Sequence, residues 1–151
     1  MWGPGLIARE KRGQRNETSV LAAIDLAPSL LKIAGVGAPA KVAFDGIESS
    51  DVLLGKTDAK RSAPLFWRRP PDRPGPPRAP LPDLAVRDGD WKLLVDFDGS
   101  GPELYDIVKD KSESKNLANE NPEVVARLKQ AVLQWNAALP KDAGQSAAAP
   151  R

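Results

Sequence analysis

The sequence predicts an α+β fold in which a small antiparallel sheet, a meander, packs against a C-terminal helix. Asp88-Gly89-Asp90 separates two runs of alternating apolar residues, which is a strong hairpin signal because glycine supplies a positive φ. A second turn at Asp98-Gly99 leads to a further strand, and a long amphipathic helix follows from residue 121. Strands followed by a helix are typical of a two-layer α+β domain.

The composition excludes several classes of function. A chain of 151 residues, 41% of them hydrophobic, is long enough for one domain with a core. The net charge of +2 is too balanced to indicate a nucleic-acid partner. Without Cys there is no disulfide or thiolate site, and without His a Ser-His-Asp triad is excluded. The longest apolar stretch, residues 20–31, contains Asp25 and Pro28 and predicts no membrane span.

The first half of the chain predicts little regular structure apart from one helix. Residues 1–18 are read as an extended segment that leads into a subdomain over 19–139. The apolar run 19–24 is either a strand or the beginning of a helix over 25–34. Asp25 is expected to cap that helix with its carboxylate, and Gly35 to end it. Its predicted apolar face consists of Leu26, Leu30 and Ile33.

A turn at 44–47, a single helical turn at 50–54 and a short strand at 63–67 are expected next. The following segment, 68–83, is rich in Pro and Arg and is predicted to be a long irregular loop, because Pro lacks a donor and restricts its neighbours. A loop this long within a compact domain is usually functional or disordered.

Three strands and a helix complete the domain. The strands are predicted at 84–87, 91–96 and 103–107. Asn121 and Pro122 are expected at the N-cap and first position of the helix, which Pro140 ends. Residues 140–151 are predicted to be a disordered tail. The apolar stripe of the helix consists of Val125, Leu128, Val132, Trp135 and Leu139.

Basic side chains near the Pro-rich loop are the first candidate site. Guanidinium groups bind sulfate, phosphate or carboxylate in a bidentate manner, although a solvated basic loop explains the same pattern. Trp67 adjoins this group, and we predict that Trp67, Arg68, Arg69, Arg73 and Arg78 lie near a substrate, with no catalytic residue and no metal ligand in the chain. The full basic group consists of Arg61, Arg68, Arg69, Arg73 and Arg78.

Two further patterns have simpler explanations. Several acidic residues could indicate a Ca²⁺ site, but turn positions explain them better, because Asp accepts backbone hydrogen bonds in turns. These residues are Asp83, Asp88, Asp90, Asp96 and Asp98. Aromatic residues could form a sugar-stacking platform, but those on predicted strands or the helix fit the core better. These are Trp91, Tyr105 and Trp135.

Taken together, short motifs in a fixed order resemble the C-terminal part of the sulfatase family, in particular the group of arylsulfatase A and N-acetylgalactosamine-6-sulfatase. The resemblance covers about residues 2–139. The matching segments are Trp2-Gly3-Pro4-Gly5, residues 25–35, Phe44-Asp45-Gly46, Leu65-Phe66-Trp67, residues 87–94, Glu103-Leu104-Tyr105-Asp106 and residues 113–118. The resemblance implies the C-terminal subdomain of an alkaline-phosphatase-like sulfatase.

In the complete enzymes, the resemblance implies a formylglycine nucleophile, made from Cys or Ser in a C/S-x-P-x-R motif, and a Ca²⁺ ion that orients the sulfate. No such position maps onto this chain. Ser62-Ala63-Pro64-Leu65-Phe66 imitates the nucleophile motif but has Phe66 in place of Arg. Many relatives carry a polar pair such as Glu-His after the Phe-Trp strand, where this chain has Arg68-Arg69.

The resemblance therefore implies a fragment of a sulfuric ester hydrolase that is inactive alone, packs on a missing N-terminal catalytic domain and borders the substrate cleft. The implied substrate is a sulfated carbohydrate or an aryl sulfate. The alternative is a non-enzymatic module that binds sulfated glycan or another acidic partner through the Arg-rich loop. No signal-peptide pattern follows Met1, whereas the resemblance implies a periplasmic or secreted parent protein.

Overall fold

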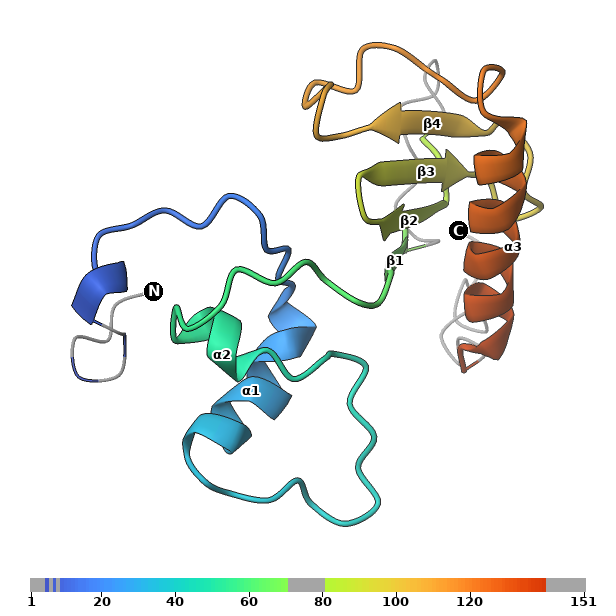
Figure 1. The fold of residues 1–151 in the computed structure, drawn as a ribbon. Helices are drawn as coiled ribbons and strands as arrows, with labels where there is room; N and C mark the ends of the chain where they lie inside the picture. The colour runs from blue at the N-terminus through green and yellow to red at the C-terminus, as the bar shows by residue number, and fades with distance from the viewer. Residues whose placement is uncertain (1–4, 6, 8, 71–80, 141–151) are drawn as a thin grey trace, which may run out of the picture. The chain divides into compact units, whose positions relative to one another are not determined.

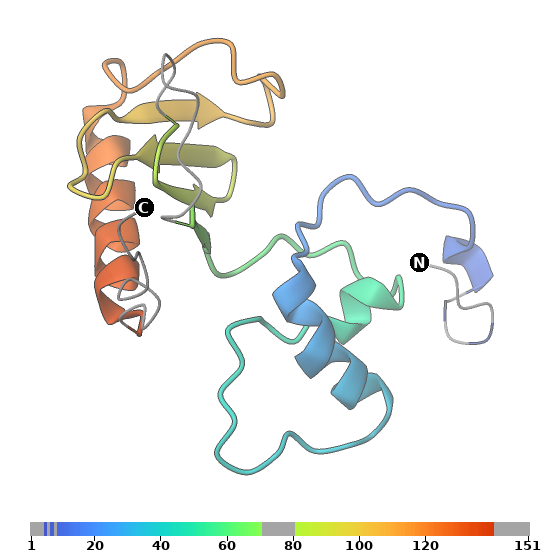
Figure 2. The same cartoon turned by 180° about the vertical axis from the view of Figure 1, so that it is seen from behind.

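The computed structural model describes residues 5, 7, 9–70 and 81–140. The chain divides into two compact units, Met1–Pro64 (unit 1) and Leu65–Arg151 (unit 2), and each is described by itself (Figures 1 and 2). The predicted disordered tail, apart from Pro140, lies outside the described residues. Among the described helices, none has the length and apolar character needed to cross a bilayer.

Unit 2 contains a four-stranded antiparallel sheet. Its strands are β1 (Leu65–Arg68), β2 (Leu84–Asp88), β3 (Trp91–Val95) and β4 (Glu103–Asp106), hydrogen-bonded in the order β1-β2-β3-β4. Each strand therefore pairs with its neighbour in sequence, which confirms the predicted meander and adds β1 as an edge strand.

The sheet register follows the alternation of apolar residues. Val86 lies opposite Leu93, and Leu93 opposite Leu104, so that these three buried side chains form one row across the central strands. Gly89, at φ +59°, makes the β2–β3 turn, as the Asp-Gly signal predicts. The pairing places alternate residues on opposite faces, so one face of the sheet is apolar and requires cover.

Helix α3 (Pro122–Ala138) covers that face (Figure 1). Val125, Leu128 and Val132 are its buried residues, as predicted, and Trp135 stacks on Phe66 with ring centroids 5.2 Å apart. The buried cluster is made of Leu84, Val86, Leu93, Val95, Leu104, Val125, Leu128 and Val132. All of these residues belong to unit 2, so the sheet and α3 carry their own hydrophobic core.

The predicted beginning of α3 is confirmed. Asn121 occupies the N-cap position and Pro122 the first helical position, as expected, but the Asn121 side chain makes no capping hydrogen bond. Its amide instead donates to the Leu117 carbonyl at 3.2 Å. Asn121 therefore ties the helix to the preceding turn rather than satisfying the free N–H groups of its first turn.

Unit 1 consists of short helices joined by irregular segments. They are the 3-10 turns η1 (Arg9–Lys11) and η2 (Ala23–Asp25) and the helices α1 (Leu26–Ile33) and α2 (Ser50–Leu53). Both α1 and α2 confirm predicted elements to within one residue at each end. The apolar run 19–24 forms no strand and leads into α1 through η2.

The predicted end of α1 at Gly35 is confirmed. Gly35 has φ +67°, its N–H donates to the Lys32 carbonyl at 3.1 Å, and the Val36 N–H donates to the Leu31 carbonyl at 3.0 Å. These two bonds form a Schellman motif, which satisfies carbonyl groups that the helix leaves without partners.

One expectation for α1 is wrong. Asp25 makes no capping hydrogen bond to the helix, because its carboxylate is used in tertiary contacts described below. The predicted apolar face is largely open: Leu26 is 44% and Leu30 51% exposed, Ile33 is partly buried, and Ser29 is the buried residue of the helix.

Gly46 is required by a close backbone approach in unit 1. A Cβ at this position would lie 2.1 Å from the carbonyl oxygen of Ile24. We expect Gly46→Ala to destabilise unit 1 by about 1–3 kcal/mol, because the backbone must shift to relieve the clash. Hydrogen exchange of residues 22–33 should accelerate. Gly37→Ala is the matched control, since nothing lies within 4 Å of a Cβ there; equal exchange rates in both variants would contradict the prediction.

Candidate functional site

The predicted substrate-proximal residues lie at the end of edge strand β1. Trp67 is 47% exposed and lies opposite Ala85, on the sheet face away from α3. Arg68 lies opposite the core residue Leu84, and its guanidinium carbon is 5.3 Å from the centre of the Phe97 ring. A guanidinium at this distance from an aromatic face is attracted by the ring quadrupole. Trp67 and Arg68 therefore present an aromatic and a basic group on opposite faces of one edge strand.

Arg69 and Asp83 close the base of the Pro-rich loop. The Arg69 N–H donates to the Asp83 carbonyl at 2.8 Å, and its guanidinium lies 2.5 Å from the Asp83 carboxylate. The second Asp83 oxygen accepts the Phe97 N–H at 3.2 Å. These contacts extend the β1–β2 ladder beyond the strands and hold the two ends of the loop together. Arg73 and Arg78 lie outside the described residues.

Arg61 does not belong with the other basic residues. Its guanidinium pairs with Asp25 inside unit 1, where the two side chains are 6% and 1% exposed. Asp25 also accepts the Ala22 N–H at 2.7 Å and the Ile47 N–H at 2.9 Å. One carboxylate thus joins three segments of unit 1 that are distant in sequence, and Arg61 is structural.

The electrostatics of Asp25 follow from these contacts. Burial disfavours its charged form, but the hydrogen bond and charge of Arg61 and the N–H groups of Ala22 and Ile47 outweigh burial and lower the pKa of Asp25 below its usual 3.8. Ser29 extends the network, because its hydroxyl donates to the Asp25 carbonyl at 2.6 Å and accepts the Ser49 N–H at 2.8 Å. The centre of unit 1 is therefore polar and fully bonded.

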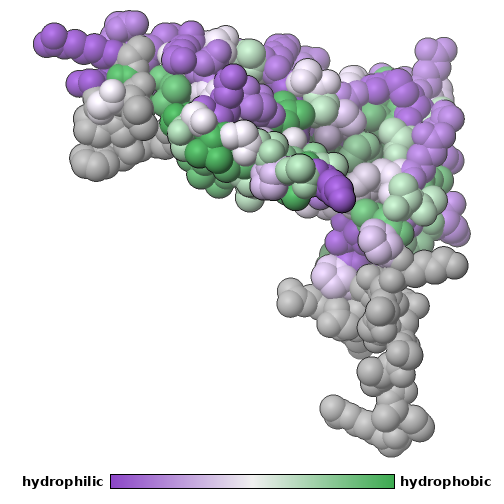
Figure 3. All heavy atoms as spheres, turned by 90° about the horizontal axis from the view of Figure 1, so that it is seen from below, coloured by the Kyte–Doolittle hydropathy of each residue, from purple (hydrophilic) through white to green (hydrophobic). Residues whose placement is uncertain are grey.

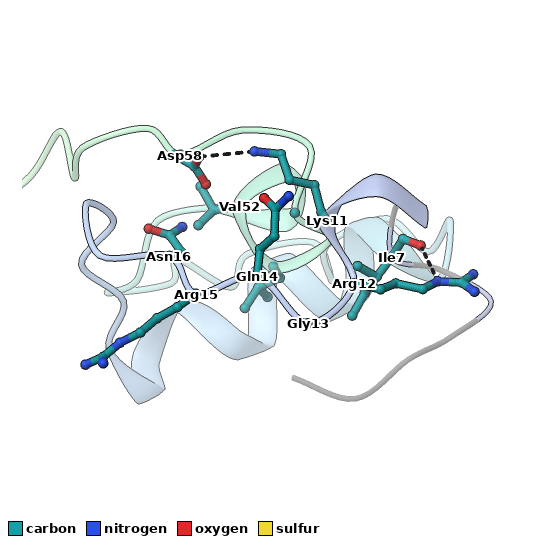
Figure 4. Close-up of a pocket in the computed structure, with 11 residues that line it drawn as sticks. Ile7, Lys11, Arg12, Gly13, Gln14, Arg15, Asn16, Val52 and Asp58 are labelled. Carbon is teal, nitrogen blue, oxygen red and sulfur yellow. Dashed lines mark hydrogen bonds and ion pairs between the residues drawn. The ribbon is translucent and has the colours of Figure 1, made fainter.

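A pocket of about 340 Å³ lies in unit 1 between the η1 segment and α2 (Figure 4). It is bordered by the basic residues Lys11, Arg12 and Arg15. Lys11 pairs with Asp58 at 3.3 Å, and Arg12 and Arg15 extend toward opposite sides of the pocket in Figure 4. The basic groups do not converge on one point, so this arrangement is not a cradle for an anion.

Among the acidic residues near the sheet, Asp98 serves a turn, as predicted, whereas Asp83 and Asp88 form ion pairs that were not predicted. Asp98 accepts the Ser100 N–H at 2.8 Å, Asp88 pairs with Arg127 at 2.5 Å, and Asp83 holds Arg69. No group of three or more Asp or Glu side chains is placed to hold a metal ion in the part of the chain that the structure describes.

The predicted core role also holds for Tyr105, which is 8% exposed.

Comparison with known proteins identifies the family. The model of the family described as N-sulphoglucosamine sulphohydrolase, C-terminal, matches residues 4–138. The chain belongs to this sulfatase C-terminal family. The fold is accordingly that of the C-terminal subdomain of alkaline-phosphatase-like sulfatases, as the order of motifs predicts.

Individual sulfatases support the assignment. The chain is 30% identical to mouse arylsulfatase K over 86% of its length, and 32% identical to the Delta 4,5-hexuronate-2-O-sulfatase of Bacteroides thetaiotaomicron over 78%. The solved structure of a 2-O GAG sulfatase superposes on 75% of the chain with a TM-score of 0.54 and 28% identity. The chain spans about a quarter of each relative: 23% of both enzymes and 24% of the solved structure.

The residues of this sulfatase domain do not fit the family's catalytic groups. Formylglycine requires Cys or Ser in a motif that ends in Arg. This chain has no Cys, and its segment Ser62-Ala63-Pro64-Leu65 is followed by Phe66 where the motif requires Arg. Phe66 is moreover a strand residue stacked on Trp135. The described residues also offer no cluster for Ca²⁺. No catalytic step is therefore derived through either group.

Sequence reasoning missed the Asp25–Arg61 pair. The signal was ambiguous, because Asp before a helix is also the normal pattern of an N-cap. The available hint was Asp25 itself, which stands alone among the apolar residues of 20–31. A charged side chain that is buried in such a run needs a partner of opposite charge.

Loss of the Asp25 charge should destabilise unit 1. Asp25→Asn leaves Arg61 buried without its counter-charge, which costs about 3–5 kcal/mol. Because the folded pKa is depressed, the stabilisation is complete above pH 3.8 and is lost as the pH falls through the lower folded value. Hydrogen exchange of residues 22–33 measured against pH should show both effects. The exposed Asp45→Asn is the control, and an unchanged exchange rate in Asp25→Asn would refute the role.

Proposed function

We propose that this chain serves as the C-terminal part of a sulfuric ester hydrolase and works with a sulfatase catalytic domain. The observation that carries the proposal is the family match over residues 4–138 in a chain about a quarter as long as the enzymes it resembles. Since neither the nucleophile motif nor a metal cluster is available in the described residues, the chain is inactive alone. The catalytic domain supplies formylglycine and Ca²⁺.

The end of β1 borders the substrate cleft in this proposal. An exposed indole next to guanidinium groups suits a sulfated carbohydrate, because sugar rings stack on aromatic faces and sulfate accepts paired hydrogen bonds from Arg. Trp67 supplies the aromatic surface on one face of β1, whereas Arg68 lies on the opposite face against Phe97, and Arg69 stands at the base of the following loop, paired with Asp83. Arg73 and Arg78 of the following loop belong to the same proposal. The relatives support this class of substrate, since two of them are named as a 2-O GAG sulfatase and a hexuronate-2-O-sulfatase.

A chimeric enzyme tests the assignment. The purified 151-residue chain should not hydrolyse an aryl sulfate. Placed in the hexuronate-2-O-sulfatase instead of the quarter it matches, the chain should give a folded enzyme that turns over a sulfated disaccharide. Turnover by the chain alone would contradict the proposal, as would a soluble, folded chimera without activity. The alternative, a non-enzymatic binding module, would be favoured if the chimera is inactive and the chain alone is retained on heparin. That retention should then be lost in Arg68→Gln and Arg69→Gln.

The substrate-proximal role of Trp67 can be measured in the active chimera. Trp67→Ala should raise KM for the sulfated disaccharide by about tenfold, the effect expected from about 1.4 kcal/mol of lost contact. It should leave kcat for a small aryl sulfate within about twofold, because that substrate does not reach the strand. Val108→Ala, at another exposed apolar residue of unit 2, is the matched control. Equal KM values for Trp67→Ala and Val108→Ala would remove Trp67 from the site.

A further inference from the structure

Unit 1 has an unusual distribution of apolar residues. Among its described residues, Leu54 is the only buried hydrophobic side chain, and the other buried positions are Asp25, Ser29, Ser49 and Ser50. Others, such as Ile33, Val52 and Leu53, are partly buried, but six large aliphatic side chains are exposed. They are Leu21, Ile24, Leu26, Leu30, Val36 and Val42, each between 41% and 55% exposed. A fold of this kind lacks the burial of apolar surface that normally stabilises a domain.

Helix α1 shows how this arises. Leu26, Leu30 and Ile33 follow one another at spacings of four and three and therefore share a side of the helix, here called the α1 face. Leu26 and Leu30 are exposed, while Ser29 is buried in the polar network of Asp25. Ile33, one turn after Ser29, is partly buried, so the open part of the α1 face is made of Leu26 and Leu30. Figure 3 shows hydrophobic residues at the molecular surface among polar ones.

The surroundings of the α1 face are poor in charge. Between residues 18 and 40, Asp25 and Lys32 are the only charged side chains in the sequence, and Asp25 is buried. Protein surfaces that face water normally carry interspersed charges, whereas the centre of an interface is depleted of them. Apolar patches of this kind mark sites of interaction with another protein surface.

The length of the related enzymes indicates which surface covers the α1 face. Enzymes that contain this same domain have about four times its length, since the chain covers 23% of mouse arylsulfatase K. Their additional chain provides a partner surface beside every copy of the domain. Unit 2 requires no such cover for its core, because α3 already buries the apolar face of its sheet. The described residues of unit 1 form no comparable apolar core.

We propose that the α1 face, together with its neighbours Ile24 and Val36, docks on an apolar surface of the catalytic portion of a sulfatase; this rests on the proposed function. Unit 1 is the half of the chain that attaches to the catalytic portion, and it completes its hydrophobic core there. Unit 2 is the half that folds on its own core.

Hydrogen exchange tests the proposal on the full chain and on the chimera described above. In the chain alone, residues 22–33 should be less protected than the peptides of β2, β3 and α3, and a hydrophobic dye should bind. In the chimera, protection of residues 22–33 should rise at least tenfold. The double variant Leu26→Lys/Leu30→Lys should abolish dye binding in the chain and cause about a tenfold loss of soluble, active chimera. Val108→Lys, an equally exposed apolar position of unit 2, is the control.

The outcomes separate this proposal from the proposed function. An inactive but folded parent chimera contradicts the proposed function. An active chimera in which Leu26→Lys/Leu30→Lys behaves like Val108→Lys overturns the docking surface alone. Sedimentation of the isolated chain identifies the competing occupant: a dimer that the double variant dissociates would assign the α1 face to a second copy. A monomeric chain with residues 22–33 fully protected and no dye binding would also overturn the proposal, whether or not the chimera folds.

Discussion

The contact between α3 and the central strands is the interaction on which the folded part of this chain depends. Val125, Leu128 and Val132 enter the apolar face formed by β2, β3 and β4, and nearly all buried aliphatic side chains of the described residues belong to this layer. The stack of Phe66 on Trp135 attaches edge strand β1 to the same helix. Because the apolar face of a sheet must be buried against another element, the sheet requires α3, and the end of β1 with its candidate site residues is positioned by that packing.

Unit 1 is held together by a different kind of interaction. Asp25 and Arg61 form a buried ion pair, and the remaining bonds of the Asp25 carboxylate go to backbone N–H groups. Such a network specifies geometry well, because each member loses water and must find its partners. It contributes less net stability than apolar burial, since desolvation offsets much of the attraction between the charges. A unit organised in this way is well defined in shape but depends on further burial of its leucines.

This division relates the structure to the role of the family. The relatives are enzymes about four times as long, so the domain contributes to a larger molecule. One half of the chain carries a core of its own and places Trp67 and Arg68 at the end of β1, with Arg69 directly after it. The other half presents six large aliphatic side chains to solvent and buries the polar network of Asp25. In the proposed arrangement, attachment and substrate contact are therefore assigned to separate units, each with the kind of surface that its task requires.

Local patterns were sufficient to predict the elements. The Asp-Gly turn, the alternation in 91–95 and the stripe from Val125 to Trp135 each depend on neighbours in sequence, and all were confirmed. The same holds for the end of α1 at Gly35, where only the left-handed backbone of the residue matters.

The roles of charged and apolar side chains needed the tertiary structure. Asp25 and Arg61 are 36 positions apart, and the sequence cannot show that the folded chain brings them into one buried pair. Likewise, the periodicity of Leu26, Leu30 and Ile33 determines that they share one side of a helix, but not what covers that side. The sequence by itself thus determined the helices, the strands and the family. Only the three-dimensional arrangement decided which polar groups are buried and which apolar face is left open, because burial depends on contacts between distant segments.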